Sequence, residues 1–192
     1  MPPKKKFSED QIIDAAFEIA KSEGIDSITI RKVAEKLGSS IAPIYVNFND
    51  VAELKQRVVR KTFEVSKDLL KEQNTGSPFQ DIGLASIRFA RDYSILFRDL
   101  VMKQNSYMNH YDSDMGDALI EKMKCDPLLE GFDIHELKTI LLKMKIFHVG
   151  LSVMVANGIL PESFDEETVK QTLESVAKDV MAAARLRKNG EL

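Results

Sequence analysis

The chain has 192 residues, of which 44% are hydrophobic and 30% charged, and its net charge is −3 at pH 7. This length suits one large domain or two small ones, and the composition is typical of a soluble globular protein. The single cysteine, Cys125, excludes an internal disulfide and a cysteine-rich metal site, and it fits a cytoplasmic location.

The first 37 residues predict two helices. Ser8, followed three residues later by Gln11, has the pattern of a capping box, and Gly24 is expected to end this helix. Thr29 is expected to cap a second, short helix, and Gly38 follows it as a turn. Apolar residues recur at helical spacing in both, at Ile12, Ile13, Ala16, Phe17, Ile19 and Ala20, then at Ile30, Val33, Ala34 and Leu37.

The next segment, GSSIAPIYVNF (38–48), contains no charged side chain. A short helix, a glycine turn and a second short helix of small residues form the outline of a helix-turn-helix. The second helix of that motif enters the major groove, where bulk is penalised and acidic groups are repelled by phosphate. Ile44 and Phe48 are expected to face inward. A plain interhelical loop with a buried patch remains the alternative.

Several residues of this motif have side chains suited to DNA contact. Tyr45 offers a hydroxyl to phosphate, Asn47 offers an amide to phosphate or a base edge, and Arg31 is expected to point away from the core. Pro43 is acceptable in the first turn of a helix, where no N–H partner is needed. The remaining candidates, small residues that permit close approach, are Ser39, Ser40 and Ala42.

Six further helices are predicted after residue 49, so the chain is expected to be all-α. Their ranges are 50–73, 78–93, 95–106, 113–124, 133–157 and 165–187. The last two are the longest and have broad apolar faces. The longest uncharged run, 146–161, is too short and polar for a membrane span, so a buried helix is expected and no membrane partner.

Charge is distributed unevenly along the chain. Residues 1–61 contain 11 Lys/Arg against 9 Asp/Glu, whereas the remainder contains 16 against 21. Contact with phosphates is therefore expected only in the N-terminal part. Within it, Lys4, Lys5 and Lys6 form a basic arm (1–7) that either reaches a DNA groove or serves as a solubilising tail.

Residues 8–54 resemble the DNA-binding domain of the tetracycline-repressor (TetR) family of transcriptional regulators. The resemblance is carried by ITIRKVAEKLGSS, by IAPIYVNF and by Leu54 on the following helix. It implies about nine helices, three in a DNA-binding domain (1–50) and the others in a helical ligand-binding and dimerisation domain (51–192). It also implies that phosphates are contacted by Thr29 and Tyr45 and bases by Ser40, Ile41, Ala42 and Pro43.

The sequence departs from the family pattern at two positions. Asn47 stands where the family often has a histidine, and Val51 stands where it often has a lysine that grips phosphate. Lys55, one helical turn after Val51, is the residue expected to compensate.

The middle of the chain contains aromatic and methionine side chains that suit either a filled core or a lipophilic effector pocket. Sequence alone favours a core for most of them, whereas the family resemblance favours a cavity. The candidate ligand-binding residues are Phe89, Tyr93, Phe97, Met102, Tyr107, Met123 and His148.

No cofactor, metal site or enzymatic activity is predicted. His110, Asp112 and Asp114 are better explained as a polar loop than as metal ligands, and no nucleophile–base pair or phosphate loop appears. The expected function is that of a homodimeric regulator, paired through its last two helices, which represses an operator until a small, partly apolar effector releases it. The alternative is a helical ligand-binding or adaptor protein that has lost operator binding.

Overall fold

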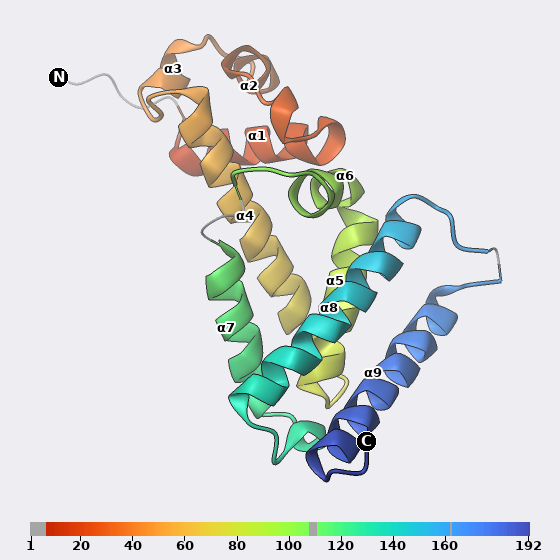
Figure 1. Ribbon diagram of the computed structural model, residues 1–192. Coiled ribbons are helices and arrows are strands. Elements are labelled where there is room, and N and C mark those ends of the chain that lie inside the picture. The colour runs from red at the N-terminus through yellow and green to blue at the C-terminus, as the bar shows by residue number, and fades with distance from the viewer. Residues whose placement is uncertain (1–6, 108–110, 162) are drawn as a thin grey trace. The chain divides into compact units, whose positions relative to one another are not determined.

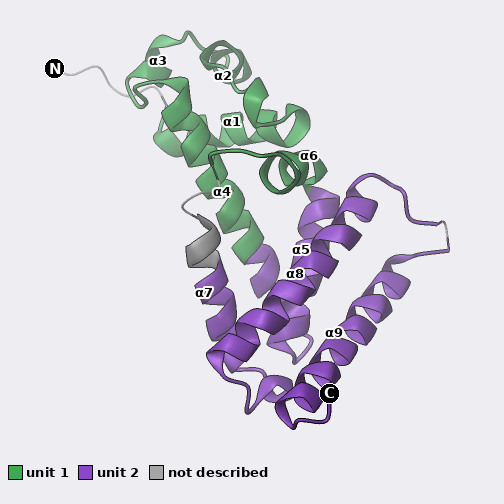
Figure 2. Ribbon diagram, in the orientation of Figure 1, with its two compact units in different colours: residues 1–67, 93–107 green, residues 68–92, 108–192 purple. Residues whose placement is uncertain are grey.

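The computed structural model describes residues 7–107, 111–161 and 163–192. In these ranges the chain forms nine α-helices and three shorter helical turns, without a strand (Figure 1). The prediction of an all-α fold with about nine helices is therefore confirmed. The chain divides into two compact units, one of residues 1–67 and 93–107 and the other of residues 68–92 and 108–192 (Figure 2).

Unit 1 consists of the first four helices, up to Lys67, together with a segment from the middle of the chain. Its elements are α1 (Glu9–Glu23), the 3₁₀ turn η1 (Ile25–Ser27), α2 (Ile30–Lys36), α3 (Ala42–Tyr45), most of α4 (Val51–Lys71), α6 (Ser94–Phe97) and the π-helical turn η2 (Arg98–Met102). The functional boundary at residue 50 stays a prediction, because compactness alone groups α4 and residues 93–107 with the N-terminal helices.

The helix ends of unit 1 follow the capping signals in the sequence. Ser8 Oγ accepts a hydrogen bond from Gln11 N–H at 3.2 Å, and Gln11 Oε1 accepts one from Ser8 N–H at 2.9 Å. This reciprocal pair satisfies two of the N–H groups that a helix start leaves without partners. Gly24 ends α1 with φ of 96°, and Thr29 caps α2. The predicted starts of both helices are confirmed.

The core of unit 1 is formed by the apolar faces that the periodicity indicated. Its most deeply buried side chains, each at most 2% exposed, include Ile12, Ala16, Ala20, Val33, Ile44, Phe48, Leu54 and Val58. Complete burial of an aliphatic or phenyl side chain contributes about 1.5–3 kcal/mol, so a few such residues hold the short helices in place. Ile44 and Phe48 face inward, as predicted.

The segment from Tyr93 to Tyr107 is less regular than the continuous helix predicted over 95–106. α6 passes into the π turn η2, which ends at Met102, and Lys103 is already extended. Asn105 Nδ2 donates to the carbonyl oxygens of Asp99, Leu100 and Lys103 at 3.1, 3.1 and 2.9 Å. The side-chain amide of Asn105 takes the place of the backbone N–H groups that would have bonded these carbonyls in a longer helix. This replacement explains why the helix ends early.

Unit 2 is a helical bundle. Its elements are α5 (Pro78–Asp92), α7 (Tyr111–Lys124), the 3₁₀ turn η3 (Pro127–Leu129), α8 (Ile134–Ala156) and α9 (Glu166–Lys188). α5 packs against α7, α8 and α9, and α8 also packs against α7 and α9. The start of α5 is held by Asp126, 2% exposed, which accepts from Ser77 Oγ at 2.6 Å and from Phe79 N–H at 2.9 Å.

α8 is the most apolar of the long helices, although Lys138, Lys143 and Lys145 are exposed on it. An 18-residue window within it has a mean hydropathy of 1.6, and by length and composition alone the helix could cross a membrane. Only 28% of that window is buried in the structure. Leu142 and Ile146, one turn apart, are 59% and 67% exposed. The sequence predicted a buried helix here, but the single chain leaves one side of it uncovered.

Candidate DNA-binding interface

The turn between α2 and α3 has the geometry that a helix-turn-helix requires. Thr29 Oγ1 accepts from Lys32 N–H at 3.2 Å and so caps α2. At the other end Gly38 has φ of 60°, and Ser39 N–H donates to the carbonyl of Ala34 at 2.9 Å. No atom lies within 4 Å of a Cβ built on Gly38, so glycine is needed for the left-handed backbone rather than for space.

α3 is short and presents an uncharged outer surface. It begins with Pro43 in its first turn, where the missing N–H leaves no hydrogen bond unmade. Ile44 is fully buried on its inner side, whereas Ile41, Tyr45 and Val46 are 49%, 54% and 52% exposed. Ser40 and Ala42 are exposed beside them. An apolar surface of this size next to small residues can contact thymine methyl groups without a steric barrier.

The hydroxyl of Thr29 lies at the exposed start of α2. Its oxygen accepts the capping hydrogen bond, and the hydroxyl proton remains available to a phosphate oxygen. Arg31 in the first turn of α2 and Lys36 in its last turn are both exposed. Lys36 was not among the predicted contacts. Its position in the last turn of α2, two residues before Gly38, is the feature of the sequence that could have indicated it.

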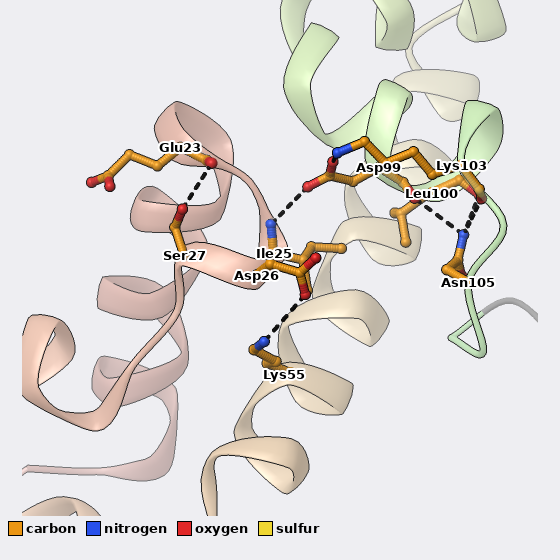
Figure 3. Close-up of polar contacts among 9 residues, drawn as sticks. All are labelled: Glu23, Ile25, Asp26, Ser27, Lys55, Asp99, Leu100, Lys103 and Asn105. Atoms are coloured by element: carbon orange, nitrogen blue, oxygen red, sulfur yellow. Dashed lines mark hydrogen bonds and ion pairs between the residues drawn. The ribbon is translucent and has the colours of Figure 1, made fainter.

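Three of the residues predicted to contact DNA have side chains that bond to other residues of unit 1 or are enclosed by them. Asn47 Nδ2 donates to the carbonyl oxygens of Pro43 at 2.8 Å and of Phe7 at 3.5 Å. Ser39 is half-buried and its Oγ is enclosed. Lys55 Nζ lies 3.3 Å from Asp26 Oδ1 (Figure 3). A role of these residues in DNA contact stays a prediction, and in this structure they act within unit 1.

The predicted ligand-binding residues are divided between the two units. Tyr93, Phe97, Met102 and Tyr107 belong to unit 1, whereas Phe89, Met123 and His148 belong to unit 2. Tyr93 packs against Phe17, with ring centroids 6.1 Å apart, and Met123 is fully buried in the core of unit 2. Met102, by contrast, is 45% exposed. For Phe97 and Met123 the structure shows packed core.

A small hollow lies beside His148 in unit 2. The space open to the centre of a water molecule is about 10 Å³, which holds about one water. His148 is 6% exposed, and burial lowers its pKa to about 4, so the ring is neutral at pH 7. A Cβ on Gly83 would lie 2.8 Å from His148 Nε2, so the glycine makes room for the ring. Lys170 and Glu174 line the same hollow.

No group of three or more potential metal ligands occurs among the described residues. Of the loop weighed as a metal site, His110 lies outside the described residues, and so do the side chains of Asp112 and Asp114. The arm residues Lys4 to Lys6 also lie outside them.

Comparisons with known proteins agree with this geometry. No protein-family model matches the chain. The chain is 24% identical over 127 residues to YobS of Bacillus subtilis, an uncharacterized HTH-type transcriptional regulator, and the match spans 64% of this chain and 66% of that protein. The similarity thus covers just under two thirds of the length of that relative.

Solved structures of similar fold cover nearly the whole chain. A TetR-like transcriptional regulator from Rhodococcus sp. RHA1 matches 91% of this chain and 95% of its own, with a TM-score of 0.65 and 18% identity. The fatty acid degradation regulator FadR from Bacillus halodurans matches 94% and 96%, with a TM-score of 0.59 and 18% identity. The chain therefore has the fold of the TetR-family transcriptional regulators, and the resemblance drawn from its sequence is confirmed at that level.

Proposed function

We propose that the chain is a cytoplasmic transcriptional regulator of the TetR type, which binds operator DNA through α2 and α3. The observation that carries the proposal is α3 itself. Its inner side is anchored by Ile44, while its outer side is apolar, small and free of acids. A helix of this kind, placed after a capped helix and a glycine turn, matches the demands of the major groove.

The mode of DNA recognition follows from the side chains that α3 exposes. Ile41 and Ala42 have no hydrogen-bonding groups for base edges, so they discriminate through contact with thymine methyls and through DNA shape. Positioning on the backbone falls to Thr29, Arg31 and Tyr45, which offer two hydroxyls and a guanidinium to phosphates. We therefore expect an A·T-containing core in each operator half-site.

A homodimer is the second part of the proposal, and α8 supports it. Leu142, Ile146 and Met154 are 59%, 67% and 37% exposed along one helix. Large apolar side chains exposed at several turns of one helix are typical of an interaction site. Pairing of α8 and α9 with the same helices of a second copy would cover it, and twofold symmetry would place two DNA-binding heads on a near-palindromic operator.

Repression and release by an effector complete the proposal. FadR, which shares the fold, is a regulator of fatty acid degradation, and the core of unit 2 is largely apolar. An effector larger than water can bind beside His148 only in a second conformation of unit 2 with more open space, because the hollow there admits about one water. An effector that binds this second state better would lower operator affinity by population shift.

The test is binding of the purified protein to the DNA directly upstream of its own coding sequence. We expect a specific, salt-sensitive complex in fluorescence anisotropy, protected in footprinting as two half-sites. Arg31→Ala should weaken binding and reduce the slope of log K against log salt by about one, because one phosphate contact is lost. Lys124, exposed on α7 of unit 2, supplies the control, and Lys124→Ala should leave both unchanged.

A second candidate is a helical adaptor or ligand-binding protein without operator binding. It is favoured by the pairing of cations in unit 1, where Lys32 contacts Glu23 at 2.5 Å and Lys55 contacts Asp26 at 3.3 Å. These pairs leave few cations for phosphate. Arg31→Ala with no effect on binding, or a wild-type protein that does not distinguish operator from random DNA, would favour this candidate.

A further inference from the structure

The segment from Tyr93 to Tyr107 is packed into unit 1, although the residues on both sides of it in the sequence belong to unit 2 (Figure 2). Leu96, Phe97 and Leu100 are 0%, 4% and 5% exposed, and α6 packs against α1. The ring of Tyr93 also lies 5.0 Å from Lys21 Nζ on α1. This segment is therefore a structural part of the unit that carries the DNA-binding helices.

The most specific contact of the segment is made by Asp99. One carboxylate oxygen, Oδ2, accepts a hydrogen bond from the backbone N–H of Ile25 at 2.8 Å (Figure 3). Ile25 is the first residue of η1, so the carboxylate satisfies an N–H that the turn leaves without a partner of its own. A hydrogen bond to an ionised acceptor is about twice as strong as a neutral one.

The approach of Asp99 depends on a glycine. A Cβ on Gly24 would lie 2.6 Å from Asp99 Oδ2, which is closer than real Cβ atoms come to another heavy atom. Gly24 also has φ of 96°, a conformation that other residues rarely adopt. The residue that ends α1 thus serves two purposes, the turn of the backbone and the admission of the carboxylate.

Asp99 is held in place from its own side as well. Lys103 Nζ lies 2.6 Å from Oδ1, the other carboxylate oxygen. Asn105 Nδ2 binds the carbonyl oxygens of Asp99 and Leu100 at 3.1 Å each (Figure 3). The side chain of Asp99 is 13% exposed, so it is both shielded and oriented.

The turn that Asp99 contacts leads directly into the DNA-binding helices. Ile28 follows η1 and is 1% exposed, and Thr29 after it caps α2. Asp26 in the same turn pairs with Lys55 on α4 (Figure 3). η1 is therefore attached to residues 93–107 through Asp99 and to α4 through Asp26, and its position determines where α2 begins.

We infer that Asp99 is a positioning residue for the DNA-binding surface: it holds η1, and hence the start of α2, in the geometry that binds operator. The inference rests on the proposed function. Asp99 itself does not contact DNA. It acts through the backbone of Ile25.

The charge of Asp99 makes the test sharp. Removal of an acidic group from a DNA-binding unit by itself strengthens binding to phosphate, and Asp99→Ala and Asp99→Asn remove the same charge. Only the asparagine variant retains a side-chain oxygen that can accept from Ile25 N–H. A positioning role therefore separates two variants that long-range electrostatics cannot distinguish.

The experiment measures operator affinity, its salt dependence and amide hydrogen exchange for the wild type, Asp99→Ala, Asp99→Asn and Lys103→Ala. We expect Asp99→Ala to bind about tenfold more weakly with an unchanged salt slope, since the number of phosphate contacts is the same. Exchange at Ile25 should accelerate in this variant alone. Asp99→Asn should bind at least as well as the wild type, whereas Lys103→Ala, which loses a positive charge and one contact of Asp99, should bind somewhat more weakly.

Gly24→Ala is a second, independent disruption, because it keeps Asp99 and its charge but displaces the carboxylate. Equal affinity of Asp99→Ala and Asp99→Asn, or wild-type affinity of Gly24→Ala, would overturn the inference. So would loss of folding in both disrupting variants, since the contact would then serve general stability. Absence of operator binding by the wild type would instead refute the proposed function, while the exchange at Ile25 would still test the contact itself.

Discussion

α3 and α8 both expose large apolar side chains, yet the two surfaces differ in length and surroundings. α3 has four residues, and the exposed Ile41 directly before it and Tyr45 at its end lie among serines, an alanine and a proline. α8 has 23 residues and exposes Leu142 and Ile146 in a helix that is largely apolar. Exposed apolar area therefore has no single meaning in this molecule.

The two surfaces suit different partners because they differ in the amount of apolar area that a partner must cover. α3 is too short to bury much area, and the residues around it are polar but not acidic. A DNA groove is a partner that accepts such a surface. A long apolar stripe cannot be matched by a phosphate-lined groove and requires another apolar surface. Substitutions on the two helices and their anchors, ordered by the size of the change each should cause, test this distinction.

The anchor of α3 should matter far more than its exposed face. Phe48 is 2% exposed. Phe48→Ala should lower the free energy of unfolding by about 3–5 kcal/mol, because apolar burial is lost and a cavity is left behind. Ile41→Ala, at a position that is 49% exposed, should stay within about 0.5 kcal/mol of the wild type. Urea denaturation measures both. Similar losses in the two variants would contradict the assignment of inner and outer faces.

The inner face of α8 should respond to pH through His148. Its pKa is lowered to about 4 by burial, against about 6.5 in the unfolded chain. The unfolded state therefore binds the proton more readily between these values, and unfolding free energy should fall by up to about 3 kcal/mol as pH drops from 7 to 4.

The control for this pH effect is His148→Leu, measured by urea denaturation at the same pH values. Its stability should lack the part of the pH dependence that the histidine causes. Parallel pH curves for the wild type and this variant would show that His148 is solvated in solution.

The outer face of α8 should control assembly. Ile146→Lys places a charge on the exposed stripe and should weaken dimerisation by about a hundredfold, because a buried unpaired charge costs several kcal/mol. Sedimentation equilibrium measures the dissociation constant. Ile159, beyond the end of α8, is similarly exposed at 60%, and Ile159→Lys should leave the dimer intact. A monomeric wild type would remove the proposed role of the stripe.

The outer face of α3 should show the smallest single effect. Tyr45→Phe removes only the hydroxyl, and loss of one phosphate hydrogen bond should weaken operator binding by about fivefold, or roughly 1 kcal/mol. The fold should be unaffected because the ring is 54% exposed. Fluorescence anisotropy with the footprinted operator measures the change. An affinity equal to that of the wild type would exclude Tyr45 as a hydrogen-bond donor to phosphate.

Much of the fold could be read from local signals. The capping box of Ser8 and Gln11, the cap at Thr29 and the glycine after α2 each act within a few residues, so local chemistry is sufficient to predict them. The same holds for Ile44 and Phe48, whose spacing on a short helix leaves one inward side. The helical end at Met102 was not predicted, since a continuous helix was expected over 95–106. The side-chain amide of Asn105 replaces backbone N–H donors to these carbonyls only when the chain turns back after Met102.

Local sequence was sufficient for the order of the helices, the uncharged motif of residues 38–48 and the apolar character of α8. Tertiary packing alone determined which polar side chains form long-range hydrogen bonds within the protein and which remain exposed. Packing brought the amide of Asn47 to the carbonyl of Phe7 across 40 positions of the chain, and it brought Asp99 to Ile25 across 74 positions. Such contacts depend on long-range packing and on the missing Cβ of Gly24, which local sequence spacing does not encode.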